Sequence, residues 1–233
     1  MTRNYRFSRA FTLIELIVVL AVIAILMSMV YPMYTSISER AKATKDMSNL
    51  RQIGMATQTY MNDNDGFFPG SPTATWMTQL ELNQKYLTVW RVIQSPFDKR
   101  SSSEAGNATT PISYGINSNL YPPPNNVAIS VSKITNPSGF ILFAPAQALG
   151  ATVSFQGTAF SAAPGVTVLG IGGNTATSTP GGNATGGTHN SRQRINALFG
   201  DLHCETMSWT TFANTTANVP GQLGQWTPYI PYP

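Results

Sequence analysis

The sequence has little charge and almost no cysteine. Charged residues make up 10% of its 233 residues, with 14 Lys and Arg against 10 Asp and Glu, whereas about 25% is usual. So few basic side chains argue against a nucleic-acid-binding protein, because such proteins displace phosphate counterions with clustered Lys and Arg. Cys204 is the single cysteine, which excludes an internal disulfide and the structural zinc sites that need two or more cysteines.

Common catalytic and metal-binding motifs are also missing. The sequence has no Gly-x-Ser-x-Gly, no His-Glu-x-x-His and no phosphate-binding Gly-x-x-x-x-Gly-Lys-Ser/Thr. Residues 62–66 read Asn-Asp-Asn-Asp-Gly, but a calcium loop with Gly66 in sixth place would start at Met61 and end at Pro72. Neither side chain binds calcium, so we expect a helix end and turn here. We expect no metal, no cofactor and no enzyme active site.

A long apolar segment stands near the N-terminus. Residues 11–31 contain one ionisable group, Glu15, and as a helix they would be about 32 Å long, enough to cross a bilayer. The next basic residue after the segment is Arg40. Three basic residues and no acidic one precede it: Arg3, Arg6 and Arg9. The positive-inside rule therefore predicts a single-pass cytoplasmic-membrane protein with an exported C-terminal part.

A cleaved secretory signal is the alternative interpretation of this segment. Such a signal has an apolar region of about 7–15 residues followed by a small-residue cleavage site. The segment here is longer, and Met27, Met29 and Tyr31 stand where the small residues would be expected. We therefore interpret residues 11–31 as a membrane-spanning helix.

Glu15 needs a partner, because an unpaired carboxylate inside a membrane costs a few kcal/mol. It could lie at the cytoplasmic interface and reach water. Alternatively, cleavage between Ala10 and Phe11 would create an ammonium four residues from Glu15, and this group could neutralise the carboxylate of a neighbouring chain. The second interpretation predicts side-by-side assembly of identical helices.

The short basic leader followed by FTLIELIVVLAVIAIL resembles the class III signal of type IV pilins and type II secretion pseudopilins. The resemblance implies that a prepilin peptidase cuts after Ala10 and that the new amine of Phe11 is methylated. It assigns assembly to Glu15, and it implies partners in an inner-membrane assembly platform and other minor pilins or pseudopilins. The family usually has Gly where this sequence has Ala10. Pro32 stands where these proteins carry a helix proline, and we expect a kink there.

Residues 32–62 continue the helix with an amphipathic pattern. Apolar residues recur at steps of three and four: Ala43, Met47, Leu50, Ile53, Ala56, Thr57, Tyr60 and Met61. This stripe would pack on a globular head. The charged side chains are expected to stay solvated, with charge pairing between subunits as the alternative: Glu39, Arg40, Lys42, Lys45, Asp46 and Arg51.

Residues 63–233 are predicted to form the head, which gives an α+β fold with the long helix packed on an antiparallel sheet. We expect a short helix at 76–87, a hairpin turn at Gly200-Asp201-Leu202 and a Gly/Thr/Asn-rich loop near 172–188. The predicted strands are 112–117, 140–144, 152–155, 166–171, 195–199 and 203–209. The predicted domains are therefore a leader at 1–10, a span at 11–31, a helix continuation at 32–62 and this head.

The C-terminal half resembles the heads of bacterial pilin-like proteins that carry a processing-associated His…Asp-Gly motif. The resemblance covers residues 96–98, SYGIN at 113–117, PSGFILF at 137–143 and the stretch from His189 to His203, although Leu202 replaces the Gly of the motif. His203 and Cys204 would point to opposite faces of a strand and could not easily hold one ion. We interpret this region as a structural hairpin rather than as a site.

The sequence predicts a structural subunit that polymerises through its N-terminal helix into a type IV pilus or a type II secretion pseudopilus. A minor tip pilin that acts as a binding or adhesion module is the alternative, and its sign would be a local aromatic or basic patch. A membrane-tethered exported enzyme is the third hypothesis, which a catalytic group of residues in a head pocket would support.

Overall fold

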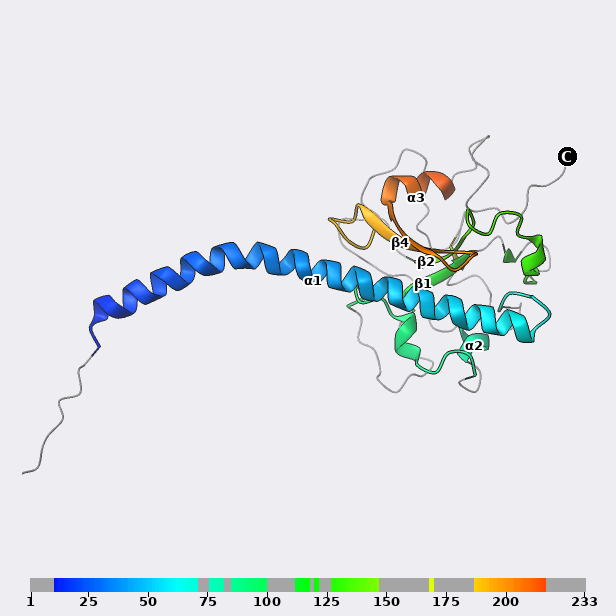
Figure 1. Cartoon of the computed structure of the whole chain (residues 1–233), viewed down its shortest axis with the longest axis horizontal. Helices are drawn as coiled ribbons and strands as arrows, with labels where there is room; N and C mark the ends of the chain where they lie inside the picture. The colour runs from blue at the N-terminus through cyan, green and yellow to red at the C-terminus, as the bar shows by residue number, and fades with distance from the viewer. Residues whose placement is uncertain are drawn as a thin grey trace, which may run out of the picture. The chain divides into compact units, whose positions relative to one another are not determined.

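A computed structural model describes residues 11–70, 76–81, 85–99, 112–117, 120–121, 127–146, 168–169 and 187–216. The chain divides into two compact units, Met1–Ala41 and Lys42–Pro233. Helix α1, Leu13–Asp63, is continuous through 51 residues and belongs to both units (Figure 1). The predicted long N-terminal helix is therefore confirmed.

The sequence Asn-Asp-Asn-Asp-Gly ends α1, as the turn residues predict. Asp65 and Gly66 adopt left-handed backbone with φ of 51° and 78°, a conformation that glycine and Asp tolerate better than most residues. The Gly66 N–H donates to the Met61 carbonyl at 2.8 Å, and the Asn64 side chain donates to the Tyr60 carbonyl at 2.8 Å. These bonds satisfy carbonyls that the helix end would leave unpaired.

The head contains a five-stranded sheet in the order β3-β1-β2-β4-β5. Its strands are β1 Tyr114–Asn117, β2 Ile141–Pro145, β3 Val168–Leu169, β4 Arg194–Phe199 and β5 Cys204–Ser208. Strands β1, β2, β4 and β5 pair antiparallel, which confirms the predicted antiparallel sheet, whereas β3 runs parallel to β1. The hairpin at residues 200–202 is also as predicted: Leu198 pairs with Cys204, and Leu202 has a φ of 70°.

Both faces of the sheet are covered, and Figure 1 shows the sheet between α1 and α3, Trp209–Thr216. One apolar cluster joins Leu50 and Ile53 of α1 to Phe143 and Leu198. The other lies on the opposite face and includes Ile141, Ile195, Phe199, Trp209 and Phe212. Along β4, Ile195, Ala197 and Phe199 enter the second cluster and Leu198 the first, as the strand period requires. In β2 the register shifts between Ile141 and Phe143, and the adjacent Leu142 and Phe143 both enter the first cluster.

Helix α3 was not predicted. Its first residue, Trp209, was expected to be the last residue of a strand over 203–209. The strand ends at Ser208 and the helix begins at Trp209. Ser208 explains the change, since its hydroxyl accepts the Thr211 N–H at 3.0 Å and thereby caps the first turn of the helix.

The helix predicted at 76–87 is shorter than expected: α2 spans Trp76–Glu81. Leu87 is still buried, and its N–H donates to the Leu80 carbonyl at 3.0 Å. Two 3-10 turns follow, η2 at Trp90–Ile93 and η4 at Val131–Lys133. The predicted strand 152–155, the leader 1–10 and most of the loop near 172–188 lie outside the described residues.

Candidate functional site

Helix α1 begins with a reciprocal pair of hydrogen bonds between Thr12 and Glu15. The Thr12 hydroxyl accepts the Glu15 N–H at 3.3 Å, and Glu15 Oε2 accepts the Thr12 N–H at 2.9 Å and the Thr12 hydroxyl at 2.8 Å. This arrangement is a capping box, which satisfies N–H groups that the helix start leaves free. The sequence carries the capping-box pattern Thr-x-x-Glu at residues 12–15, which is the signal that could have predicted Thr12 as the partner of Glu15.

The first part of α1 exposes an apolar surface. Every residue from 11 to 37 is exposed, and even Ile23, the most covered of the large apolar side chains there, keeps 46% of its surface exposed. Among the described residues, α1 is the helix that is long and apolar enough to cross a membrane, with a mean hydropathy of 3.0 over 18 residues. The helix near the N-terminus is therefore consistent with a membrane anchor.

The other residues singled out at the N-terminus are placed as follows. Ala10 lies outside the described residues, and Phe11 is 82% exposed. Pro32 lies inside α1, and the helix continues through it without a break. The Thr35 hydroxyl donates to the Pro32 carbonyl at 2.9 Å. A kink at Pro32 stays a prediction, as do the roles of Ala10, Phe11 and Glu15.

The second part of α1 carries a fully buried carboxylate, Asp46. Asp46 Oδ1 accepts hydrogen bonds from Ser95 Oγ at 2.5 Å and from the Tyr114 hydroxyl at 2.7 Å. Asp46 Oδ2 accepts from Asn196 Nδ2 at 2.9 Å, and Asn196 Nδ2 also donates to the Ala43 carbonyl at 3.0 Å. The donors come from the segment after η2, from β1 and from β4, so one side chain connects α1 to three parts of the head.

The expectation that Asp46 is solvated is wrong. Its spacing could have revealed this, because Asp46, Asn49 and Ile53 follow the same three- and four-residue steps as the apolar stripe. Burial raises the pKa of Asp46, and the hydrogen bonds from Ser95, Tyr114 and Asn196 only partly offset this rise. Burial, and then the nearby Asp46 charge, raise the pKa of Tyr114 well above its usual value.

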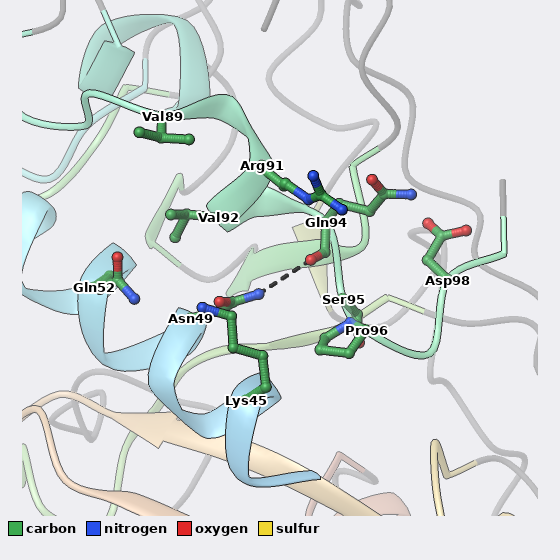
Figure 2. A pocket seen from close by; sticks show the side chains of 10 residues that line it. All are labelled: Lys45, Asn49, Gln52, Val89, Arg91, Val92, Gln94, Ser95, Pro96 and Asp98. Atoms are coloured by element: carbon green, nitrogen blue, oxygen red, sulfur yellow. Dashed lines mark hydrogen bonds between the residues drawn. The ribbon is translucent and has the colours of Figure 1, made fainter. Parts of the chain in front are cut away.

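An open groove of about 640 Å³ runs beside this cluster, between α1 and residues 89–98 (Figure 2). Lys45, Asn49 and Gln52 form its α1 side. Asn49 Nδ2 donates to the Gln94 carbonyl at 3.1 Å, the bond that Figure 2 marks with a dashed line, and to the Tyr114 hydroxyl at 3.4 Å. This groove was not predicted, because its two walls are about 45 residues apart in the chain.

The two histidines occupy different surroundings. His189 is buried, contacts the Thr188 hydroxyl at 3.0 Å and stacks on Phe97 with ring centroids 5.7 Å apart. His203 is exposed, contacts Asp201 at 2.5 Å and stacks on Phe199 at 4.3 Å. Burial raises the pKa of Asp201, but hydrogen bonds from His203 outweigh it and lower the value overall.

Cys204 is half-buried, and its thiol contacts the Met47 carbonyl at 3.8 Å, on the α1 side of the hairpin. Burial raises the pKa of this thiol, which makes it a poor nucleophile. Within the part of the chain that the structure describes, no three His, Cys, Asp or Glu side chains come together in a way that could hold a metal ion. The geometry thus makes Asp201 and His203 part of a hairpin turn and assigns no chemistry to Cys204.

Comparison with known proteins finds one known motif, at the N-terminus. The family model for the prokaryotic N-terminal methylation motif matches residues 5–31. No curated protein and no solved structure matches the chain. The motif, the long apolar N-terminal helix and the antiparallel sheet together fit a type IV pilin-like protein.

Proposed function

We propose that the chain is a structural subunit of a type IV pilus or a type II secretion pseudopilus. A prepilin peptidase hydrolyses the peptide bond between Ala10 and Phe11, and the new Phe11 amine is then methylated. Before assembly the chain is anchored in the cytoplasmic membrane with its head exported. An assembly platform then adds it to a filament. The matched motif covers both residues of the cleavage site and supports this assignment.

The observation that carries the proposal is the exposed apolar surface of residues 11–37. In one isolated chain nothing covers this surface, so it must contact lipid or protein. Burial of apolar surface is favourable by about 25 cal/mol per Å², and helices of identical copies can bury it on one another outside the bilayer. The same helix thus serves as a membrane anchor before assembly and as a filament core afterwards.

The head supports a structural role in a second way. The described part of the head contains two apolar clusters that leave the sheet covered on both faces. A head with its own core can sit on the outside of a filament while the helix of residues 11–37 provides the contacts. A motif of this kind is typical of a structural subunit rather than of an enzyme.

Electron microscopy of material sheared from the surface, combined with mass spectrometry of the subunit's N-terminus, tests the proposal. We expect filaments that contain this chain and an N-terminus that starts at methylated Phe11. An unprocessed chain that remains a monomer in the membrane would contradict both parts. Long surface filaments would favour a pilus, whereas filaments that appear only on overproduction would favour a pseudopilus.

A further inference from the structure

The groove beside α1 contains a buried polar atom that no described residue satisfies. Asn49 is 2% exposed, and its Nδ2 is held by the Gln94 carbonyl and the Tyr114 hydroxyl. These bonds fix the orientation of the amide, because a flipped amide would place Oδ1 against the Gln94 carbonyl. Oδ1 is left without a hydrogen bond from any residue that the structure describes, although a buried acceptor normally has a partner.

The same groove is basic. Lys45 and Arg91 line its two sides, and both are exposed. Asp98 lines it as well and accepts the Ser113 hydroxyl at 2.7 Å, so two basic side chains face one acidic side chain in the groove. A bound group therefore fits best when it brings a carboxylate to Lys45 and a hydrogen-bond donor to Asn49 Oδ1. Because Oδ1 is closed to bulk water, such a group must displace neighbouring side chains as it enters.

In the proposed filament, each chain lies next to other copies of itself, so a second copy could occupy the groove. This inference rests on the proposed function. The groove-lining part of α1 begins at Lys45, eight residues after Ile37, the last large exposed apolar residue in the helix's first part. Two identical grooves would repel each other, since both are basic. The second copy must therefore contribute a different surface, and such a head-to-tail contact produces a helical filament rather than a closed dimer.

The described acidic side chains narrow the choice of that surface. Asp63 is paired with Lys85 at 2.8 Å, Asp201 with His203, and Asp46 is buried. Glu15 and Asp98 accept hydrogen bonds from Thr12 and Ser113, and Glu39 is half-buried. Asp65 and Glu205 are exposed. Glu205 lies within strand β5. Asp65 lies in the turn after α1, and a turn can enter a groove more easily than a strand within a sheet can.

The turn also offers the second group that the groove requires. Asn62 is exposed, and its Oδ1 accepts the Gln58 amide at 3.1 Å. This bond leaves the Asn62 Nδ2 pointing away from Gln58 as a donor. Residues 62–66 thus combine a carboxylate and an amide donor, which complement Lys45 and Asn49 Oδ1. We propose that the groove lined by Lys45 and Asn49 binds the turn of residues 62–66 from a second copy of this chain.

A zero-length carbodiimide coupling of purified filaments tests this contact, because it joins an amine to a carboxylate only when the two touch. Within one chain, Lys45 and Asp65 are about 27 Å or more apart along the helix, so a Lys45–Asp65 product must join two copies. We expect a covalent dimer band whose peptide map contains this bond, and we expect Lys45→Gln to remove it.

Charge reversal provides the second readout. Lys45→Glu should lower filament yield about tenfold, because like charges then face each other, and Asp65→Lys in the same chain should restore it. Lys133→Glu is the matched control, since Lys133 is exposed and does not line the groove. Filaments that form without a Lys45–Asp65 product, or that couple Lys45 to another carboxylate, overturn this inference and leave the proposed function intact. A processed chain that never assembles overturns the proposed function, and this inference with it.

Discussion

At the scale of single residues, Glu15 caps its own helix, and we propose that it also takes part in assembly. In the unprocessed chain its carboxylate closes the capping box with Thr12, so the side chain already has hydrogen-bond donors within its own helix. Cleavage after Ala10 would add a cation at Phe11, one turn away. The carboxylate could then serve the cap of its own helix, the amine of a neighbour, or both.

Substitutions of Glu15 separate these roles. Glu15→Ala should leave the protein in the membrane but impair assembly, because it removes both the cap, worth about 1 kcal/mol, and the charge. Glu15→Gln keeps the capping-box hydrogen bond without the charge. If charge pairing aligns the copies, filament yield by electron microscopy should fall in both variants, with equal protein in the membrane fraction. A normal filament yield from Glu15→Gln would show that the charge is not needed and that helix capping is the remaining role of Glu15.

Asp46 shows how a buried acid can stabilise a fold and still carry a cost. Three donors surround its carboxylate, so removal of the side chain leaves three buried polar groups without their acceptor. Its pKa is nevertheless raised, because burial penalises the charge more than the donors favour it. The folded head therefore binds a proton at Asp46 more tightly than the unfolded chain does.

This difference predicts the pH dependence of stability. For an acid whose pKa is raised in the folded state, the contribution to stability is fully present below the unfolded pKa near 3.8 and is lost as the pH rises through the folded value. Relative to Asp46→Asn, the wild-type head should gain stability as the pH falls from neutral towards 4. Urea unfolding in detergent at several pH values measures this difference.

A second substitution checks that titration. Asp46→Ala should destabilise the head by about 1–3 kcal/mol, because the three donors lose this acceptor, and the loss should grow as the pH falls towards 4. A wild-type curve parallel to that of Asp46→Asn would contradict a raised pKa.

At the scale of elements, α1 combines two kinds of helix in one. Its first part is exposed and mostly apolar, whereas residues 46–61 bury one face in the head. Gly54 lies close to the β4–β5 hairpin on that face: a Cβ there would lie 2.9 Å from Leu198 and 3.2 Å from Leu202. The hairpin of β4 and β5 is thus packed directly on the helix.

Gly54 substitutions test this packing. Gly54→Leu should destabilise the head by about 1–3 kcal/mol, because a large side chain overpacks the contact with Leu198. Gly54→Ala should have an effect near zero, since the gain in helix propensity of about 1 kcal/mol offsets the small displacement of two flexible leucine side chains. Thermal unfolding followed by circular dichroism compares the two variants. Equal stability of Gly54→Leu and wild type would show that helix and hairpin are not tightly packed.

At the scale of the whole molecule, the proposed cleavage after Ala10 would change the net charge of the chain. Removal of residues 1–10 takes away three arginines and lowers the side-chain net charge from +4 to +1. It also removes the basic segment that would hold the N-terminus on the cytoplasmic side. We therefore expect cleavage to be the step that allows the chain to leave the membrane.

Substitutions of Ala10 test this step. Ala10→Phe should block maturation, because the peptidase accepts a small residue before the cut, and the uncleaved chain should stay in the membrane without forming filaments. Ala10→Gly restores the residue that the family usually has, and it should be cleaved at least as efficiently as wild type. Intact-mass measurement of the membrane and sheared fractions distinguishes the two forms. Filaments built from uncleaved Ala10→Phe chains would refute the link between cleavage and assembly.

The sequence alone determined the features that depend on neighbouring residues. An uninterrupted apolar run, a three- and four-residue stripe and a cluster of Asn, Asp and Gly set the long helix, its buried face and its end, because helix periodicity and turn chemistry act over a few residues. The antiparallel hairpin at residues 200–202 follows in the same way. The methylation motif is equally local.

Only the tertiary structure decided where the polar side chains of α1 go. Asp46 meets donors that lie 49, 68 and 150 residues away in the chain, and Asn49 meets a carbonyl 45 residues away. A helical pattern places such residues on a face but does not show what covers that face. The hydrogen-bond partners of Asp46, the basic groove and the parallel strand β3 therefore became visible only when distant segments came together in the head.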